Sequence, residues 1–488
     1  MKKLSLFAAL LLVFSLVPPG ENSQAQADFG RLAAEECKLY GNNSLEDPIR
    51  YEDSGHVEDW SKFANPIGSI STLVIPVDFS DVPALTALSV VERQMKEVSE
   101  TLYALSHGQA DIKMTVMDHW VRLPLTAKQY METPDWYKKI YDSYVAASPS
   151  VDLQAYDLVL IKTDEKNLVV NVAGALPMRD QLLPSGERVP RGAFLGTDYW
   201  TAIGQGKQVA IHEIMHVFGL PDLYMPNDDG QKPVGIYDLM SSFRLEYKER
   251  IIGWHKWKLG WIRDSQVNCY SASISLNLTF GVSEEPRIDV VRLSSQKVLV
   301  IETYEDPYRP NRASLLAYVV NAKEFVWRSS GLFGVRSPVQ VVIPTQVRNQ
   351  NPQEWGKEFL PGYTATVENL KLEAKAVSGG IQMKITSAPI QKTLSTFNGT
   401  STVLSASQKE EITKFLADNP SAQKIVCTGI RYYSQPMSVN IMVRKRAKAA
   451  CDYAKQLNPN LSTWYQNKPT QARNYAGKVL LTVKSPNY

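Results

Sequence analysis

HEIMHVFGLPD, residues 212–222, is the stretch that says most about this chain, because it holds the ligands of a complete metal site. His212 and His216 are four positions apart. A helix with about 3.6 residues per turn therefore places both imidazoles on one face, within reach of one Zn²⁺. Gly219 permits the left-handed backbone that ends a helix, after which Asp222 can approach the metal from outside it. Three protein ligands leave one coordination position open, which is typical of catalytic zinc.

A bare H-E-x-x-H pattern also occurs in ordinary surface helices, so the surrounding residues decide between the two interpretations. Two of the six histidines of the chain fall in this one motif, and its helix carries the apolar residues Val209, Ile211, Ile214, Met215 and Phe218. Glu213 directly follows the first histidine, where its carboxylate can accept a proton from the attacking water. We therefore predict a catalytic zinc site with Glu213 as the general base.

This region resembles the immune inhibitor A-like secreted metallopeptidases of the metzincin clan. The resemblance is carried by HEIMHVFGLPDLY (212–224), YDLMSS (237–242), which is similar to a Met-turn, and WHKWKLGW (254–261), with further likeness in STLVIPVDFS (71–80) and LSHGQ (105–109). It extends over residues 65–330. It implies a zinc endopeptidase that acts on proteins or peptides and binds the metal through His212, His216 and Asp222.

The resemblance also assigns Met240 as the apolar floor beneath the metal. Most metzincins use a third histidine, so Asp222 makes this site more anionic and should raise the basicity of the bound water. Tyr237 has two interpretations that the sequence leaves open. Its phenol can stabilise the oxyanion of the transition state, or its ring can pack around the turn.

We predict an α/β (α+β) fold, in which a metzincin-like catalytic domain with a mixed twisted sheet and a zinc helix is followed by a β-rich unit and a small α/β domain. Apolar periodicity predicts strands at 72–79, 111–120, 156–162 and 167–172 and helices at 88–105 and 128–147. A further helix is expected at 246–261. It carries Trp254, Trp257 and Trp261 at helical spacing, which is more typical of core packing than of a ligand site.

Changes in composition along the 488 residues predict six segments. They are a signal peptide (1–27), a polar N-terminal extension or short propeptide (28–65), the catalytic domain (66–268), a β-rich domain (269–388), a Ser/Thr/Gly linker (389–400) and an α/β accessory domain (401–488).

The signal peptide is indicated by a basic start, the apolar stretch Leu4–Val17 and the small residues Ala25 and Ala27. Because the stretch is shorter than a bilayer requires, cleavage is favoured over a membrane anchor. The mature protein is expected to be secreted, into the extracellular or periplasmic space, with no membrane span. The net charge of +3 is too small to indicate nucleic acid as a partner.

The four cysteines are an even set in an exported chain, which favours disulfides over metal ligation. Of the three pairings that four cysteines allow, we favour Cys427–Cys451 within the C-terminal unit and therefore Cys37–Cys269. A role for Cys37 as a cap on the zinc of a latent form is the alternative interpretation.

Two segments near the zinc motif have both a functional and a plain interpretation. Asn227–Gly230 (NDDG) offers carboxylate and amide oxygens for Ca²⁺, but an Asp-Gly turn explains the same residues, and we favour the turn. Gly192–Gly196 lies just before the zinc helix and is either the rim of a cleft or a plain loop.

Beyond the linker, the order helix, strand, helix, strand at 405–416, 422–429, 443–456 and 477–484 weakly resembles outer membrane protein A-like domains, which hold peptidoglycan. Arg446 matches that pattern. Tyr432 stands where the family has an acidic residue, and the spacing from Asn440 to Arg446 is one residue short. The resemblance implies a cell-wall polymer as a partner, whereas the departures favour a plain accessory domain. The alternative function is therefore a cell-wall or surface binding protein with a structural zinc domain.

Overall fold

The computed structural model describes residues 31–484, apart from the segments 42–53, 58–59, 134–136, 165–172, 177–180, 197–204, 225–232, 243–248, 273–274, 282–285, 306–311, 323–336, 348–355, 388–389, 418, 420–421 and 423. The signal peptide, the strand expected at 167–172 and the Asn227–Gly230 segment lie outside the described residues. Those three remain predictions.

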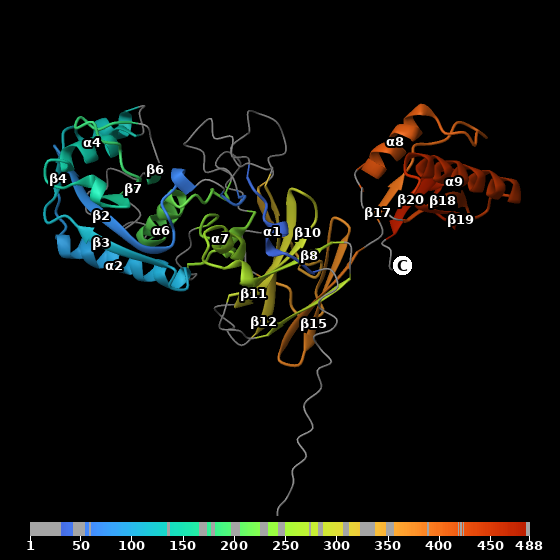
Figure 1. The fold of residues 1–488 in the computed structure, drawn as a ribbon, viewed down its shortest axis with the longest axis horizontal. Coiled ribbons are helices and arrows are strands. Elements are labelled where there is room, and N and C mark those ends of the chain that lie inside the picture. The colour runs from blue at the N-terminus through green and yellow to red at the C-terminus, as the bar shows by residue number, and fades with distance from the viewer. Residues whose placement is uncertain are drawn as a thin grey trace, which may run out of the picture.

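A mixed six-stranded sheet, with the order β3-β2-β5-β7-β6 and with β4 paired to β2, precedes the zinc motif (Figure 1). Its strands are β2 (Gly68–Phe79), β3 (Ala110–Val116), β4 (Val121–Leu123), β5 (Leu158–Thr163), β6 (Gly174–Leu176) and β7 (Gly192–Leu195). All the pairings are parallel except that of β6 with β7. The segment that we expected to be a loop or a cleft rim is thus mostly the buried strand β7.

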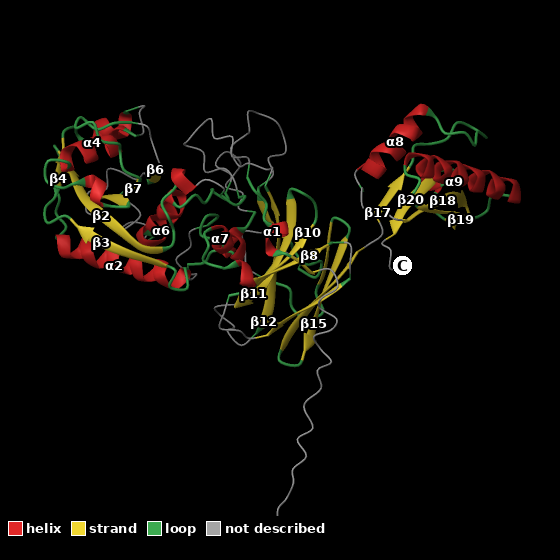
Figure 2. Cartoon of the chain, viewed as in Figure 1, coloured by secondary structure: helices red, strands yellow, loops and turns green. Residues whose placement is uncertain are grey.

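Helices cover both faces of this sheet (Figure 2). Successive residues of a strand point to opposite sides, and those of β2 are apolar on both, so both faces need a partner. On one face, α2 (Leu88–Leu105) and α6 (Gly206–Val217), which carries His212 and His216, share a core with Ile70 and Val74 of β2. On the other face, α3 (Ala127–Glu132) and α4 (Lys138–Ala147) pack on Leu73 and Ile75. The expected helix at 88–105 is α2.

Two expected helices are shorter than predicted. The helix expected at 128–147 is divided into α3 and α4, because Thr133 precedes a proline and adopts the extended conformation that this position favours. Of the helix expected at 246–261, the described residues are helical only in α7 (Gly253–Lys258). Ile252 is extended, and its amide donates to the carboxylate of Asp238 instead of entering a helical turn.

Two further sheets follow α7 and pack on each other. The first has the order β1-β8-β10-β11-β12-β13, in which β1 (Arg31–Leu32) comes from the N-terminal segment, and the second has the order β14-β15-β16-β9. In β11, Leu299 and Ile301 face the core between these sheets, whereas Val298 and Val300 belong to the core that contains α6. The strands are β8 (Val267–Ser271), β9 (Leu276–Gly281), β10 (Ile288–Arg292), β11 (Lys297–Glu305), β12 (Ala313–Asn321), β13 (Val339–Val341), β14 (Thr364–Val367), β15 (Leu370–Val377) and β16 (Gly380–Ser387).

The described part of the N-terminal segment, which we expected to be an extension or short propeptide, packs on the first of these sheets and on α7. β1 (Arg31–Leu32) pairs with β8 and is followed by α1 (Ala34–Cys37). The His56 ring lies 5.0 Å from the Trp254 ring and 4.5 Å from the Trp257 ring. The carbonyl of Ser54 accepts a hydrogen bond of 2.6 Å from the Trp254 indole.

The C-terminal unit has its own sheet, with the order β17-β20-β18-β19, and its own core. Its elements are β17 (Ile390–Thr393), α8 (Ala406–Ala417), β18 (Lys424–Tyr432), α9 (Met437–Leu457), β19 (Ser462–Thr470) and β20 (Val479–Lys484). The expected linker is therefore wrong in part, because β17 pairs with β20 and Phe397 fills the core. Arg446 is buried and donates to the carbonyls of Gly399, Ser401 and Gly477, so its guanidinium serves the unit itself.

Both predicted disulfides, Cys37–Cys269 and Cys427–Cys451, are confirmed. Cys37 therefore has no free thiol, and its alternative role as a cap on the zinc is wrong. Among the described helices, none combines the length and the apolar character needed to cross a membrane.

Candidate metal centre

Helix α6 carries both histidines of the motif and ends in a Schellman motif directly after them. Gly219 has a φ of +93°, and the amides of Gly219 and Leu220 donate to the carbonyls of His216 and Met215 at 2.9 and 3.0 Å. This cap turns the chain back along the helix within a few residues. The third predicted ligand thereby returns to the histidines.

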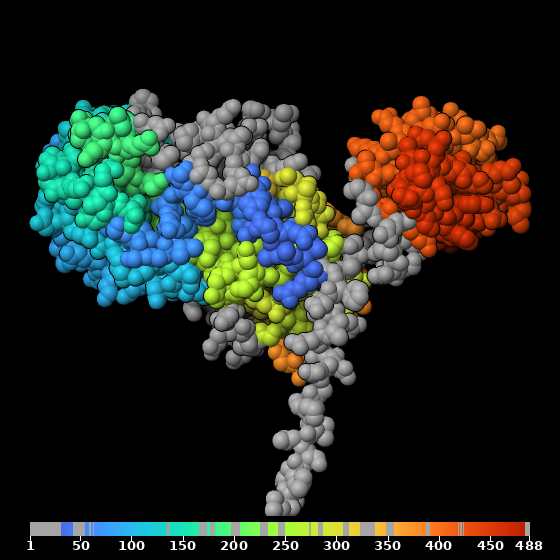
Figure 3. Space-filling model, viewed as in Figure 1, coloured from blue at the N-terminus to red at the C-terminus, as the bar shows by residue number. Residues whose placement is uncertain are grey.

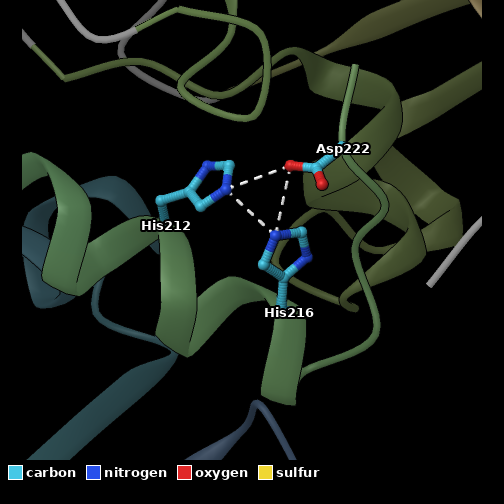
Figure 4. A group of neighbouring side chains, drawn as sticks. All are labelled: His212, His216 and Asp222. Carbon is cyan, nitrogen blue, oxygen red and sulfur yellow. Dashed lines mark hydrogen bonds and ion pairs between the residues drawn. The ribbon is translucent and has the colours of Figure 1, made fainter. Parts of the chain in front are cut away.

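The structure brings His212, His216 and Asp222 together (Figure 4). The two Nε2 atoms lie 3.0 Å apart, and Oδ1 of Asp222 lies 3.1 and 3.2 Å from them. In a tetrahedral zinc site with bonds of about 2.0–2.1 Å, neighbouring ligand atoms are about 3.3–3.4 Å apart. The three atoms are therefore spaced almost like one face of a zinc tetrahedron.

Two backbone carbonyls orient the imidazoles. Nδ1 of His212 lies 3.3 Å from the carbonyl oxygen of Leu239, and Nδ1 of His216 lies 2.7 Å from that of Leu220. Because a carbonyl oxygen can only accept, each Nδ1 must carry a proton. In the neutral tautomer, each Nε2 then presents its lone pair to the other two atoms, as in histidines that bind a metal.

This set of donor atoms requires a positive charge between them. Two nitrogen lone pairs and a carboxylate oxygen repel one another at these distances, unless a proton or a metal ion lies between them. The two histidine side chains are buried, and that of Asp222 is 16% exposed. Two nitrogens and one oxygen at near-tetrahedral spacing match the ligand preference of Zn²⁺.

The pKa values of His216 and Asp222 also favour a positive charge between the three side chains. Burial lowers the pKa of His216, but the Asp222 and Glu213 carboxylates outweigh burial and raise that pKa to about 9. For Asp222, burial raises the pKa, but the two imidazoles outweigh burial and hold it well below its usual range. The carboxylate thus stays ionised and favours a cation at the imidazole nitrogens.

Glu213 is buried beside these three residues. Burial raises the pKa of its carboxyl group, and the charges of His212 and His216 oppose that rise. A carboxylate with a raised pKa takes up a proton more readily near neutral pH. The surroundings of Glu213 therefore suit the general base that the motif predicts.

Residues 237–242, which we call the Met-turn, are tied to the segment that carries Asp222. The amide of Leu223 donates to the carbonyl of Met240 at 2.8 Å. Met240 is completely buried in the same core as Ile214 and Met215 of α6. This position agrees with the apolar floor that the resemblance implies.

The contacts of Tyr237 favour packing over oxyanion stabilisation. Its hydroxyl donates to Glu358 at 2.9 Å and accepts from the amide of Lys357 at 3.0 Å. Its ring lies 5.1 Å from the ring of Tyr304. Both the phenol and the ring are thus engaged with the β-rich part of the chain.

The sequence reasoning missed three neighbours of the ligands. Two are the carbonyls of Leu220 and Leu239, which no pattern can reveal because every residue has a carbonyl. The third is Tyr224, whose ring lies 6.2 Å from that of His212 and nearly parallel to it. Its position two residues after Asp222 was the available signal.

Comparisons with known proteins add little to this geometry. No family model and no curated protein matches the chain. Among solved structures, the chain is similar to the OmpA-like domain of FopA1 from Francisella tularensis subsp. tularensis SCHU S4. The identity is 16%, the match covers 24% of this chain and 81% of that chain, and the TM-score is 0.17. This likeness is too weak to carry an argument about fold or ligand.

Proposed function

We propose that this chain is an exported, zinc-dependent endopeptidase of the metzincin type. The observation that carries the proposal is the convergence of two imidazole Nε2 atoms and one carboxylate oxygen at 3.0–3.2 Å. The resemblance of residues 212–224 and 237–242 to secreted metallopeptidases supports the same conclusion and suggests proteins or peptides as substrates.

In this proposal, His212, His216 and Asp222 hold the zinc. When bound, zinc supplies Lewis-acid chemistry, which makes water nucleophilic near neutral pH and polarises the scissile carbonyl. Glu213 removes the proton of the attacking water and delivers it to the departing amine. The carbonyls of Leu220 and Leu239 keep both Nδ1 atoms protonated, so that the Nε2 lone pairs stay available.

The edge of the central sheet supports a peptide substrate. β6 is the last strand of that sheet in the described residues, runs antiparallel to β7 and contacts α6. A peptide that pairs with β6 in an extended conformation would pass beside the zinc helix. Such strand addition binds the backbone of the substrate and suits cleavage within a chain.

The test is the Glu213→Gln variant of the full exported chain, which keeps the size of the side chain and removes its basicity. Zinc content is measured by elemental analysis, and proteolysis by the release of peptides from casein. We expect one zinc per chain in both proteins and a loss of cleavage of at least about a hundredfold in the variant.

Glu132→Gln is the matched control, because Glu132 is an exposed carboxylate at the end of α3. It should cleave casein like the unsubstituted protein. Full cleavage by Glu213→Gln contradicts the role of Glu213. Absence of zinc from the unsubstituted protein, purified without chelators, contradicts the whole proposal.

A further inference from the structure

We propose that Asp238 is a positioning residue of the metal centre, which joins the Met-turn to α7 and thereby fixes the carbonyl that orients His212. The inference rests on the proposed function, since it concerns the ligand of the proposed zinc. The carboxylate of Asp238 is buried, and its two oxygens accept hydrogen bonds from different segments of the chain.

The first oxygen of Asp238 shapes the Met-turn itself. Oδ1 accepts the amide of Met240 at 2.7 Å, and the backbone carbonyl of Asp238 accepts the amides of Ser241 and Ser242 at 3.0 and 3.2 Å. These three bonds close the turn around the peptide unit of Leu239. The amide of Met240 belongs to the same peptide unit as the Leu239 carbonyl. The bonds of Asp238 therefore set the direction of that carbonyl.

The second oxygen reaches a different segment of the chain. Oδ2 accepts the amide of Ile252 at 3.1 Å and lies 3.0 Å from Nδ1 of His255 in α7. The amide of Leu239 donates to the carbonyl of Arg250 at 2.8 Å in the same region. Both Asp238 and His255 are completely buried.

A turn alone does not require this arrangement. An aspartate that accepts the amide two residues later is a common local turn motif and is usually solvated. Here the carboxylate is withdrawn from water, which is costly unless all its partners are in place. The bridge to Ile252 and His255 supplies those partners and ties the Met-turn to a helix.

The consequence for the metal lies at His212. Its Nδ1 is 3.3 Å from the Leu239 carbonyl, longer than the 2.7 Å of the corresponding bond of His216. A weaker bond tolerates less displacement, so the orientation of His212 depends on where the Met-turn holds that carbonyl. Groups that orient metal-binding histidines change metal affinity by about 10- to 100-fold when they are removed.

The experiment uses the full chain with the Asp238→Asn substitution. The amide keeps the shape of the carboxylate but places an N–H opposite the N–H groups that Asp238 accepts. Zinc affinity is measured by competition with a chromophoric chelator, and ligand geometry by the visible absorption of the Co²⁺-substituted protein. We expect zinc affinity to fall by about 10- to 100-fold and the Co²⁺ bands to change.

Asp289→Asn is the matched control for the loss of a buried carboxylate. Asp289 is also completely buried and accepts from Asn268 at 2.8 Å and Arg287 at 3.0 Å, but it belongs to β10. It should lower the Tm while leaving zinc affinity and the Co²⁺ spectrum unchanged. Equal loss of zinc affinity in both variants overturns the inference, because the effect is then general destabilisation.

Unchanged zinc affinity and an unchanged Co²⁺ spectrum in Asp238→Asn overturn this inference and leave the proposed function intact. An unsubstituted protein that binds neither ion overturns the proposed function and the inference with it. If Asp238→Asn does not fold, His255→Phe decides, because it removes one of the two partners of Oδ2 and leaves the amide of Ile252 in place. Lower zinc affinity in that variant supports the bridge, and unchanged affinity overturns it.

Discussion

The ionic interaction between His216 and Asp222 makes the binding of a metal dependent on pH. Without a metal, Asp222 keeps the pKa of His216 at about 9, so this imidazole is protonated at neutral pH. A metal must displace that proton before the nitrogen can act as a ligand. Metal binding is therefore linked to the loss of a proton throughout the range below this pKa.

We predict that zinc affinity rises by up to about tenfold per pH unit from pH 7 to 9 and then levels off. The sign follows from the raised pKa, since fewer chains hold the competing proton as the pH approaches it. Chelator competition at several pH values measures this slope. Calorimetry in two buffers of different ionisation enthalpy measures the released proton directly. Equal affinity at pH 7 and pH 8.5 contradicts the assignment of the proton to His216.

A substitution at Tyr237 distinguishes a structural role of this residue from a catalytic one. Tyr237→Phe keeps the ring against Tyr304 but removes the hydrogen bonds that the hydroxyl makes with Glu358 and with the amide of Lys357. We predict a loss of stability of about 1–3 kcal/mol and a kcat within a fewfold of the unsubstituted protein. Thermal unfolding and casein cleavage measure the two effects. A loss of kcat of about 100-fold or more at unchanged zinc content restores the oxyanion interpretation.

Among secondary structure elements, the end of α6 is the one on which the site depends most. A Cβ at Gly219 would lie 3.1 Å from the Phe63 ring, and the φ of +93° is unfavourable for any other residue. Phe63 belongs to the N-terminal segment, and the amide of Ala64 donates to the carbonyl of Val217 at 3.0 Å. The N-terminal segment thus packs against the C-terminal end of α6.

We predict that Gly219→Ala destabilises the protein by about 1–3 kcal/mol or more and also weakens zinc binding, because the cap positions the chain that leads to Asp222. Gly186→Ala is the matched control, since Gly186 has a φ of +88° and open space where a Cβ would lie. Gly186→Ala should lower the stability of the protein through backbone strain while its zinc affinity stays normal. Comparable zinc affinity in both variants contradicts a role for the cap in placing the ligand.

The elements that the sequence predicted well are those specified by local patterns. The helix at 88–105 and the approach of Asp222 to His212 and His216 follow from periodicity and from one glycine, which act within a few turns of chain. The short helix α7 could not be predicted, because the partner that keeps Ile252 out of the helix is Asp238 in the Met-turn. Strand β17 was missed because four residues become a strand only through their pairing with β20.

Across the whole molecule, the central sheet and the β-rich sheets share a common core. A single core joins Val74 of the central sheet to Val300 and Tyr318 of the β-rich sheets. The amide of Gly253 donates to Glu302 at 3.0 Å, and that of Trp254 donates to Tyr318 at 3.0 Å. By contrast, the C-terminal unit has its own core and disulfide, and it lies to one side of the rest (Figures 1 and 3).

This difference predicts opposite outcomes for two truncations. A chain that ends at residue 388 keeps the shared core and Cys37–Cys269, so it should fold, bind one zinc and cleave casein at a rate similar to that of the full chain.

A chain that ends at residue 268 loses β10, β11 and β12, which exposes the apolar side of α7 and removes the partners of Gly253 and Trp254. We expect it to be insoluble or to bind no zinc. Zinc content, circular dichroism and casein cleavage of both chains measure the outcome. A soluble, zinc-loaded and active chain ending at residue 268 would show that the β-rich sheets are an addition to a self-sufficient catalytic domain.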